Sequence, residues 1–193
     1  YMLGMINLVN KLATLGMSVS CPSIWFESLI SRARNSSAAA ALSNKDDYLM
    51  FIDTDVIFDA NDVVKLLDAD KDVTVGLYPK KYISNEKIQF LSKKYSQIPD
   101  FWRELVGDFS SEFDNKVFKN NESLIEVKYA ATGFMLIKTS VFNSIAKSKP
   151  DLKYNNDIDG YMSYGDNFYD FFRCWVNPET KKYESEDYGF CKV

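Results

Sequence analysis

The sequence predicts an α/β fold with a mostly parallel, mixed central sheet flanked by helices. Helix-like and strand-like segments alternate through residue 80, which is typical of sheets covered by helices on both faces. The strand candidate at residues 48–52 is a continuous apolar run, as expected for a strand buried on both sides. The chain has 193 residues, enough to bury a core, so we expect a single domain over residues 1–193.

Apolar spacing and helix stop signals define the elements of the first half. The helical pattern of the first segment stops at Gly16, and Asp59 can cap the third helix, with Asp62 in its first turn. The expected elements are, in order, a helix over 2–15, a strand over 17–21, a helix over 27–42, a strand over 48–52, a helix over 59–67 and a strand over 73–78.

The second half begins with a polar and aromatic segment. Residues 91–123 are expected to form an excursion from the main layers, with a weak helical core at "FWRELV" (101–106). The elements expected after it are strands over 124–130 and 134–138, a helix capped by Thr139 or Ser140, a strand over 168–176 and a helix beginning in "ESEDYGFCK".

Composition excludes several classes of protein. The net charge of -4 disfavours binding to nucleic acid, and no apolar stretch approaches the ~20 residues of a transmembrane helix. Three cysteines without CxxC spacing favour a reducing compartment, and we expect a soluble, cytoplasmic protein. Histidine is absent, so acid and base chemistry has to use carboxylates, Lys, Tyr or Cys.

Two carboxylates come directly after the buried strand candidate at residues 48–52. The spacing of Asp53 and Asp55 recurs at Asp68 and Asp70, but only the first pair comes after a buried strand, where open α/β sheets bind ligands. Neighbouring carboxylates repel unless solvent or a cation separates them, and a hard divalent ion meets that need. The alternative is a solvated turn at the strand end whose aspartates cap the next element of the chain.

The stretch "YLMFIDTDVIF" resembles the DxD strand of GT-A-fold glycosyltransferases, particularly family-2-like enzymes of phages and large DNA viruses. Four further stretches resemble the same group in the same order: "ESLISRARN", "VGLYPKK", "ATGFMLIKTSVF" and "YESEDYGFC". Together they touch most of the chain outside residues 91–123.

The resemblance implies a GT-A-like (Rossmann-like) fold and a metal-dependent transferase. Its donor would be a nucleotide-sugar such as a UDP-sugar, and its acceptor a hydroxyl of a glycan or glycoprotein. Inversion at the anomeric carbon is the implied outcome. Asp53 and Asp55 match the positions that hold Mn²⁺ or Mg²⁺, which stabilises the charge of the departing diphosphate. A virus-encoded protein acting in the host cytoplasm is also implied.

The remaining implied site residues come from the other matching stretches. Asp187 matches the general base of inverting members, with Glu186 second, although both could simply be acidic residues at a helix N-terminus. The implied donor-binding residues are Arg32, Arg34, Thr54 and Lys80, and the implied acceptor-binding residues are Thr132, Gly133 and Trp175. Surface arginines and lysines, a turn glycine and a core tryptophan are the ordinary structural alternatives.

The resemblance has one departure and one rival. GT-A enzymes begin with a strand, whereas this chain begins in a predicted helix, so we expect the first strand to be missing from the sequence.

The same "DTDV" also fits haloacid-dehalogenase-like phosphatases, in which Asp53 would be the nucleophile and Asp55 the acid/base. "GDNFYD" (165–170) matches their later metal motif. A non-catalytic relative that binds carbohydrate or sugar nucleotide is a further alternative.

Overall fold

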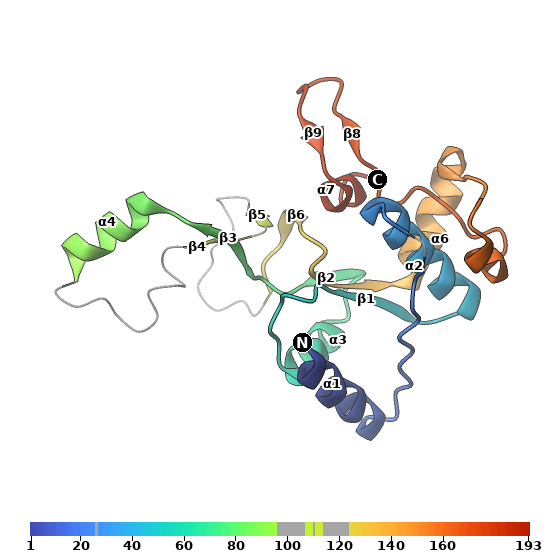
Figure 1. Cartoon of the computed structure of the whole chain (residues 1–193), viewed down its shortest axis with the longest axis horizontal. Coiled ribbons are helices and arrows are strands. Elements are labelled where there is room, and N and C mark those ends of the chain that lie inside the picture. Colours follow the sequence, from blue (N-terminus) through green and yellow to red (C-terminus); the bar gives the residue numbers. More distant parts are fainter. Residues whose placement is uncertain (26, 96–106, 110, 114–123) are drawn as a thin grey trace. The chain divides into compact units, whose positions relative to one another are not determined.

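The computed structural model describes residues 1–25, 27–95, 107–109, 111–113 and 124–193, which form two compact units (Figure 1). The first unit comprises Tyr1–Gly76 and Ala131–Val193, and the second comprises Leu77–Ala130. The expected excursion over 91–123 falls within the second unit, and its expected helical core over 101–106 lies outside the described residues.

The first unit is built on a three-stranded sheet with the order β1-β7-β2. β1 (Tyr48–Ile52) and β2 (Val73–Val75) each pair antiparallel with β7 (Phe134–Lys138). The mixture of helices and strands agrees with the predicted class, but the prediction of mostly parallel pairing does not hold among the described strands, where each pair is antiparallel. β1 and β2 do run in the same direction, yet they are separated by β7.

The central position of β7 agrees with its composition. Its residues 134–137 are all buried, and a strand covered on both faces and paired along both edges has to be apolar throughout. The position of β7 between β1 and β2 could not be predicted, because chain order alone does not reveal which strand is inserted between two earlier ones.

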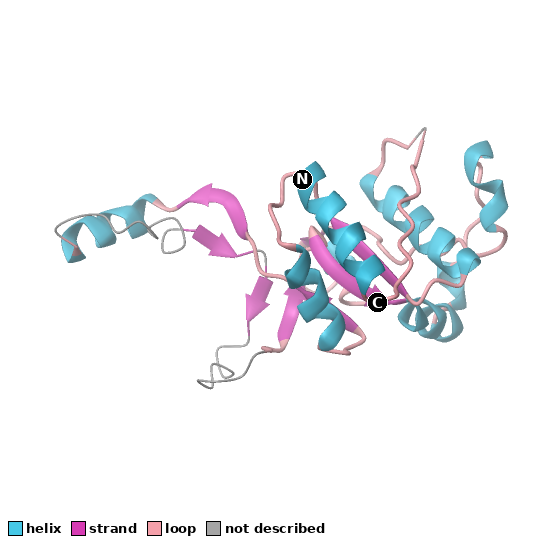
Figure 2. Cartoon of the chain, turned by 90° about the horizontal axis from the view of Figure 1, so that it is seen from below, coloured by secondary structure: helices cyan, strands magenta, loops and turns pink. Residues whose placement is uncertain are grey.

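Helices lie on both sides of this sheet. α1 packs with α3 on one side, and α2 packs with α6 on the other (Figures 1 and 2). The α-helices of the first unit are α1 (Met2–Thr14), α2 (Ile30–Asn44), α3 (Ala60–Asp68), α6 (Thr139–Ser148) and α7 (Glu186–Phe190). Two 3₁₀ helices, Pro150–Leu152 and Asp159–Tyr164, come after α6, and a hairpin of β8 (Trp175–Val176) and β9 (Tyr183–Glu184) precedes α7.

Two antiparallel strand pairs and one helix make up the described part of the second unit. β3 (Pro79–Ile83) pairs with β4 (Gly107–Phe109), and β5 (Ser111–Phe113) pairs with β6 (Val127–Ala130). Its helix, α4 (Asn85–Lys94), is capped by Ser84, whose hydroxyl accepts a hydrogen bond from the backbone N–H of Lys87 at 3.3 Å.

Aromatic rings form much of the core of the first unit. Phe142, Phe171 and Phe172 are fully buried, and the Phe172 ring stacks on Phe190 with 4.6 Å between centroids.

The prediction of a strand over 168–176 is wrong for most of its length, since only Trp175 and Val176 form a strand there. Its phenylalanines are buried by ring packing from a loop, which the apolar pattern alone does not distinguish from a strand.

Other local expectations had mixed outcomes. The capping of α3 is confirmed: the Asp59 side chain accepts from the N–H of Asn61, and the Asp62 side chain accepts from the N–H of Asp59. Residues 17–21 form no strand and are exposed. α6 begins at Thr139, one of the two predicted starting residues, but the prediction that Thr139 or Ser140 caps it is wrong, because the N-cap is Lys138 and no side chain caps the helix.

Candidate active site

The two predicted metal-binding aspartates lie on a tight turn at the end of β1. The N–H of Asp53 donates to the carbonyl of Gly133 on the neighbouring chain segment at 2.8 Å, and the N–H of Val56 donates back to the carbonyl of Asp53 at 3.0 Å. Val56 is buried and anchors the turn, whereas Thr54 and Asp55 are exposed. The turn therefore holds the Asp53 backbone against the sheet and leaves both carboxylates accessible to solvent.

A buried arginine from α2 reaches this turn. The Nη2 atom of Arg34 lies 3.8 Å from Oδ1 of Asp53, and its guanidinium carbon lies 5.1 Å from the centre of the Phe51 ring. The Arg34 side chain is only 9% exposed, against 46% for Asp53. Arginine is rarely this buried without a partner, so Arg34 is part of the packed interior that supports the turn.

Arg34 also contacts the C-terminal acidic stretch. Its Nε atom lies 3.6 Å from Oε1 of Glu186, the first residue of α7. One guanidinium thus joins three segments that are far apart in the sequence: α2, the turn after β1 and the start of α7. Both distances exceed the usual 2.7–3.2 Å of an N–H···O hydrogen bond, and within the described part of the chain the buried Nε of Arg34 has no hydrogen-bond partner.

Asp187, the next residue along, is held differently. The hydroxyl of Ser185 donates to Oδ1 of Asp187, and the backbone N–H of Tyr188 donates to the same oxygen at 2.9 Å. Both donors belong to the N-terminal end of α7. Asp187 thus satisfies groups at the N-terminus of its own helix, where a carboxylate is favourable.

Close packing fixes the position of α7. A Cβ atom added at Gly189 would lie 2.0 Å from the carbonyl oxygen of Arg173, so the helix approaches the preceding loop more closely than any larger residue allows. The side chains of Glu184 and Lys192 form an ion pair across the two ends of this segment. Glu186 is therefore presented to Arg34 by a tightly packed helix.

The predicted acceptor-side residues Thr132 and Gly133 lie beside the aspartate turn. Gly133 accepts the hydrogen bond from Asp53, and both residues are buried. Thr132 is 1% exposed, and its hydroxyl oxygen has no hydrogen-bond partner among the residues that the structure describes. Buried hydroxyls normally have a partner, so this end of the sheet contains polar groups that the protein itself leaves unsatisfied.

Two other predicted residues, Arg32 and Trp175, make contacts outside this group, and Lys80 belongs to the second unit. The Nε of Arg32 donates to Glu27 at 2.5 Å, and this hydrogen bond raises the pKa of the guanidinium. Arg173 lies over the ring of Trp175 at 4.7 Å. Lys80 is an exposed residue of β3 in the second unit.

Sequence reasoning missed the role of Asn35. Its side chain is 2% exposed, donates to Asp170 at 3.0 Å and accepts from the backbone N–H of Phe172 at 2.8 Å, which ties α2 to the aromatic loop. The available signal was the polar run "SRARN" inside an alanine-rich helix, because polar residues on the buried side of a helix need partners.

Two aspartates of the rival phosphatase motif "GDNFYD" (165–170) contact other side chains. Asp170 accepts the hydrogen bond from Asn35, and the 98% exposed Asp166 lies 3.5 Å from Lys153. Neither of these contacts includes Asp53. Across the described ranges, moreover, no group of three or more Asp, Glu, Cys or His side chains is arranged to hold a metal ion.

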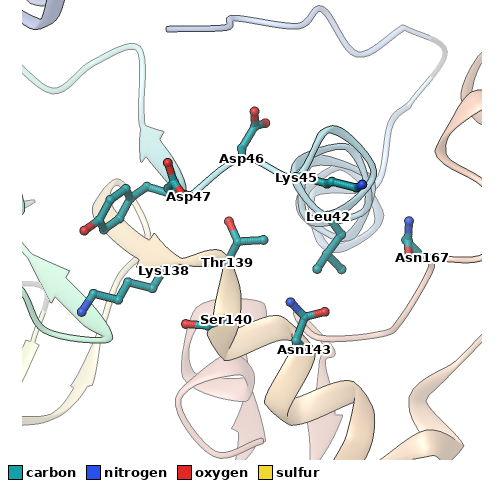
Figure 3. A pocket seen from close by; sticks show the side chains of 10 residues that line it. Leu42, Lys45, Asp46, Asp47, Lys138, Thr139, Ser140, Asn143 and Asn167 are labelled. Carbon is teal, nitrogen blue, oxygen red and sulfur yellow. The ribbon is translucent and has the colours of Figure 1, made fainter. Parts of the chain in front are cut away.

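A separate open hollow of about 770 Å³ lies at the opposite end of β1 and β7. Figure 3 shows Thr139, Ser140 and Asn143, from the start of α6, facing the loop that carries Asp46 and Asp47. None of the predicted site residues lines this hollow.

Comparison of the chain with protein-family models, curated proteins and solved structures gave no match in any of the three. Among the helices that the structure describes, none is both long enough and apolar enough to cross a membrane.

Proposed function

We propose that the chain is a metal-dependent glycosyltransferase of the GT-A type that moves a sugar from a nucleotide-sugar, such as a UDP-sugar, to a hydroxyl of a glycan or glycoprotein. The observation that supports this most is the grouping of Arg34, Asp53 and Glu186. The resemblance singled out each of these residues on a different stretch, and a chance resemblance gives no reason for the three to meet.

The chemistry of the turn fits a hard divalent cation. Mg²⁺ and Mn²⁺ are commonly bound by one or two carboxylates together with water and substrate phosphates, so a group of three protein ligands is not required. Asp53 and Asp55 are both reached by solvent and would hold the ion. Bound there, it would offset the negative charge that develops on the departing diphosphate.

The chain's own residues supply orientation and a proton acceptor. The turn fixes the Asp53 backbone through Gly133, and Arg34 places positive charge beside it in a mostly dry environment. A carboxylate of the "ESED" stretch, Glu186 or Asp187, takes the proton of the acceptor hydroxyl, since the chain has no histidine. The proposed reaction is a single displacement with inversion. A virus-encoded enzyme of the host cytoplasm remains part of this proposal.

The phosphatase alternative is less well supported. It needs the carboxylates of "GDNFYD" beside Asp53, whereas Asp170 is bound to Asn35 and Asp166 pairs with Lys153. A phosphatase would hydrolyse a generic phosphomonoester and bind beryllium fluoride on Asp53, and neither result is expected here.

The first test is binding of UDP measured by calorimetry with and without Mn²⁺. We expect binding only with the ion, and its loss in Asp55→Ala. Asp68→Ala is the matched control, because Asp68 and Asp70 have the same spacing but lie at the end of helix α3 rather than after a strand. Metal-independent binding, or equal loss in both variants, would contradict the proposed metal site.

The second test is transfer itself. The purified chain is incubated with Mn²⁺ and a panel of UDP-, GDP- and CMP-sugars, and release of the nucleotide is measured. Binding without release in the presence of any glycan acceptor would favour a non-catalytic relative. A product with the donor's anomeric configuration would refute the single displacement.

A further inference from the structure

The two neighbouring carboxylates of α7 have different surroundings, and Glu186 contacts the arginine that also reaches the aspartate turn. Successive residues of a helix point about 100° apart, so Glu186 and Asp187 do not face the same space. Glu186 lies 3.6 Å from Arg34, which in turn lies 3.8 Å from Asp53. Asp187 is bound within its own helical turn.

We infer that Glu186, rather than Asp187, is the carboxylate that accepts the acceptor's proton, and that Arg34 is the positioning residue that holds it there. This inference rests on the proposed glycosyltransferase function. It reverses the order of preference given by the resemblance, in which Asp187 comes first.

The hydrogen bonding of the two carboxylates supports the choice. Oδ1 of Asp187 already accepts from the Ser185 hydroxyl and the Tyr188 N–H, so the carboxylate is oriented by its own helix and one of its two oxygens is engaged there. The contact between Glu186 and Arg34 is longer than a hydrogen bond, so it orients the carboxylate by charge and leaves its oxygens able to accept an incoming hydroxyl.

The roles give a balanced reaction. The acceptor oxygen forms a bond to the anomeric carbon while the bond from that carbon to the diphosphate oxygen breaks. The electron pair of the broken bond leaves on the diphosphate, and the proton of the acceptor hydroxyl moves to a carboxylate oxygen of Glu186. When water replaces the acceptor, the same steps hydrolyse the donor.

Arg34 acts through Glu186 and does not need to touch the acceptor. Its side chain is buried between Phe51, Asp53 and Glu186, so it has little freedom to move. A guanidinium carries donors in several directions, and Lys has only a single ammonium, so replacement by Lys keeps the charge while losing the simultaneous reach to both carboxylates.

The test compares isosteric variants of adjacent residues. Release of UDP from UDP-glucose, UDP-galactose and UDP-N-acetylglucosamine with Mn²⁺ is measured for Glu186→Gln and Asp187→Asn, and each variant is melted by circular dichroism. General base catalysis contributes roughly 10²–10⁴-fold, so we expect Glu186→Gln to lose at least 100-fold in kcat with little change in donor KM. Asp187→Asn should mainly lower the melting temperature and should stay at least tenfold more active than Glu186→Gln.

Arg34 is tested by a conservative and a non-conservative change. Arg34→Met should lower kcat more than it raises donor KM, and Arg34→Lys should recover part of the loss. Should Glu186→Gln fail to fold, Glu186→Asp and Asp187→Glu replace the pair, and the first should again be the slower.

The possible outcomes distinguish a failure of the proposed glycosyltransferase function from a failure of the inference about Glu186. A wild-type chain that releases no nucleotide from any sugar nucleotide overturns both the proposed function and this inference. An active wild type in which Asp187→Asn is as slow as Glu186→Gln, or slower, overturns the inference alone. A larger effect of Arg34→Met on KM than on kcat would make Arg34 a donor ligand instead of a positioning residue.

Discussion

Replacement of Gly189 by alanine tests how α7 is positioned. The new Cβ atom would lie 2.0 Å from the carbonyl oxygen of Arg173 and 3.2 Å from its carbonyl carbon. Both obstacles are backbone atoms, so no side-chain rotation can relieve the overlap, and either the helix or the loop has to move. Gly160 is the matched control, because a Cβ atom there would meet nothing within 4 Å.

The magnitude is set by two opposing effects. Overpacking of a fitted site usually destabilises by about 1–3 kcal/mol, and a backbone obstacle places Gly189→Ala near the upper end of that range. Replacing glycine by alanine in a helix also stabilises the folded state by up to about 1 kcal/mol, because alanine has the higher helix propensity. We therefore expect a net loss of about 2 kcal/mol in the free energy of unfolding, which for a chain of this size lowers Tm by roughly 4–8 °C.

Urea and thermal unfolding followed by circular dichroism measure this loss. Gly160→Ala should stay within about 0.5 kcal/mol of wild type, as surface changes usually do. Because α7 carries Glu186, the rate of nucleotide release should also fall in Gly189→Ala and not in Gly160→Ala. Equal stability of the two variants would refute the close approach of α7 to the Arg173 carbonyl.

Three further predictions concern stability. Asp59→Ala removes the cap of α3 and should lower the free energy of unfolding by about 1 kcal/mol in urea, and an unchanged midpoint would contradict the cap. Gly76→Ala places a Cβ atom 2.3 Å from the buried ring of Phe134 and should lower the free energy of unfolding by about 1–3 kcal/mol in the same measurement. An unchanged midpoint would show that the ring moves aside without loss. Burial, together with the negative charge of Asp170, raises the pKa of Tyr154 to about 12. The phenol of the unfolded chain ionises near pH 10, so the contribution of the neutral, buried Tyr154 to stability is full below pH 10 and is lost as the pH rises to about 12. Unfolding midpoints measured across this pH range should therefore fall less in Tyr154→Phe than in the wild type.

The local elements with strong signals were predictable from the sequence. The strand at 48–52 and the cap at Asp59 were confirmed, because an uninterrupted apolar run and an N-cap aspartate with an acidic residue three positions later are both local patterns. The sheet order was not predictable in this way. The pairing of β1 with β7 joins residues more than 80 positions apart, and nothing local in either segment states the direction of its partner.

Part of the candidate site was also visible in the sequence. The exposed position of Asp55 after an apolar strand could be expected from the strand pattern, although β1 is only half-buried. The burial of Arg34 could not be expected, since an arginine on a helix is usually solvated. The difference between the surroundings of Glu186 and those of Asp187 could not be predicted from the sequence either. Both are acidic residues at a helix start, and only the position of Arg34 and the bonds from Ser185 and Tyr188 tell them apart.

Exposure distinguishes the two roles that we propose for the carboxylates beside Arg34. Asp53 is 46% exposed and can exchange its solvation for a cation and the phosphates that accompany it. Glu186 is 17% exposed, and its Oε1 atom lies 3.6 Å from Nε of Arg34. A group that must receive a proton only when an acceptor arrives is better kept away from bulk water, which would otherwise compete for its oxygens. In the proposed enzyme, the same buried arginine would therefore support an exposed, cation-binding carboxylate on one side and a largely buried proton acceptor on the other.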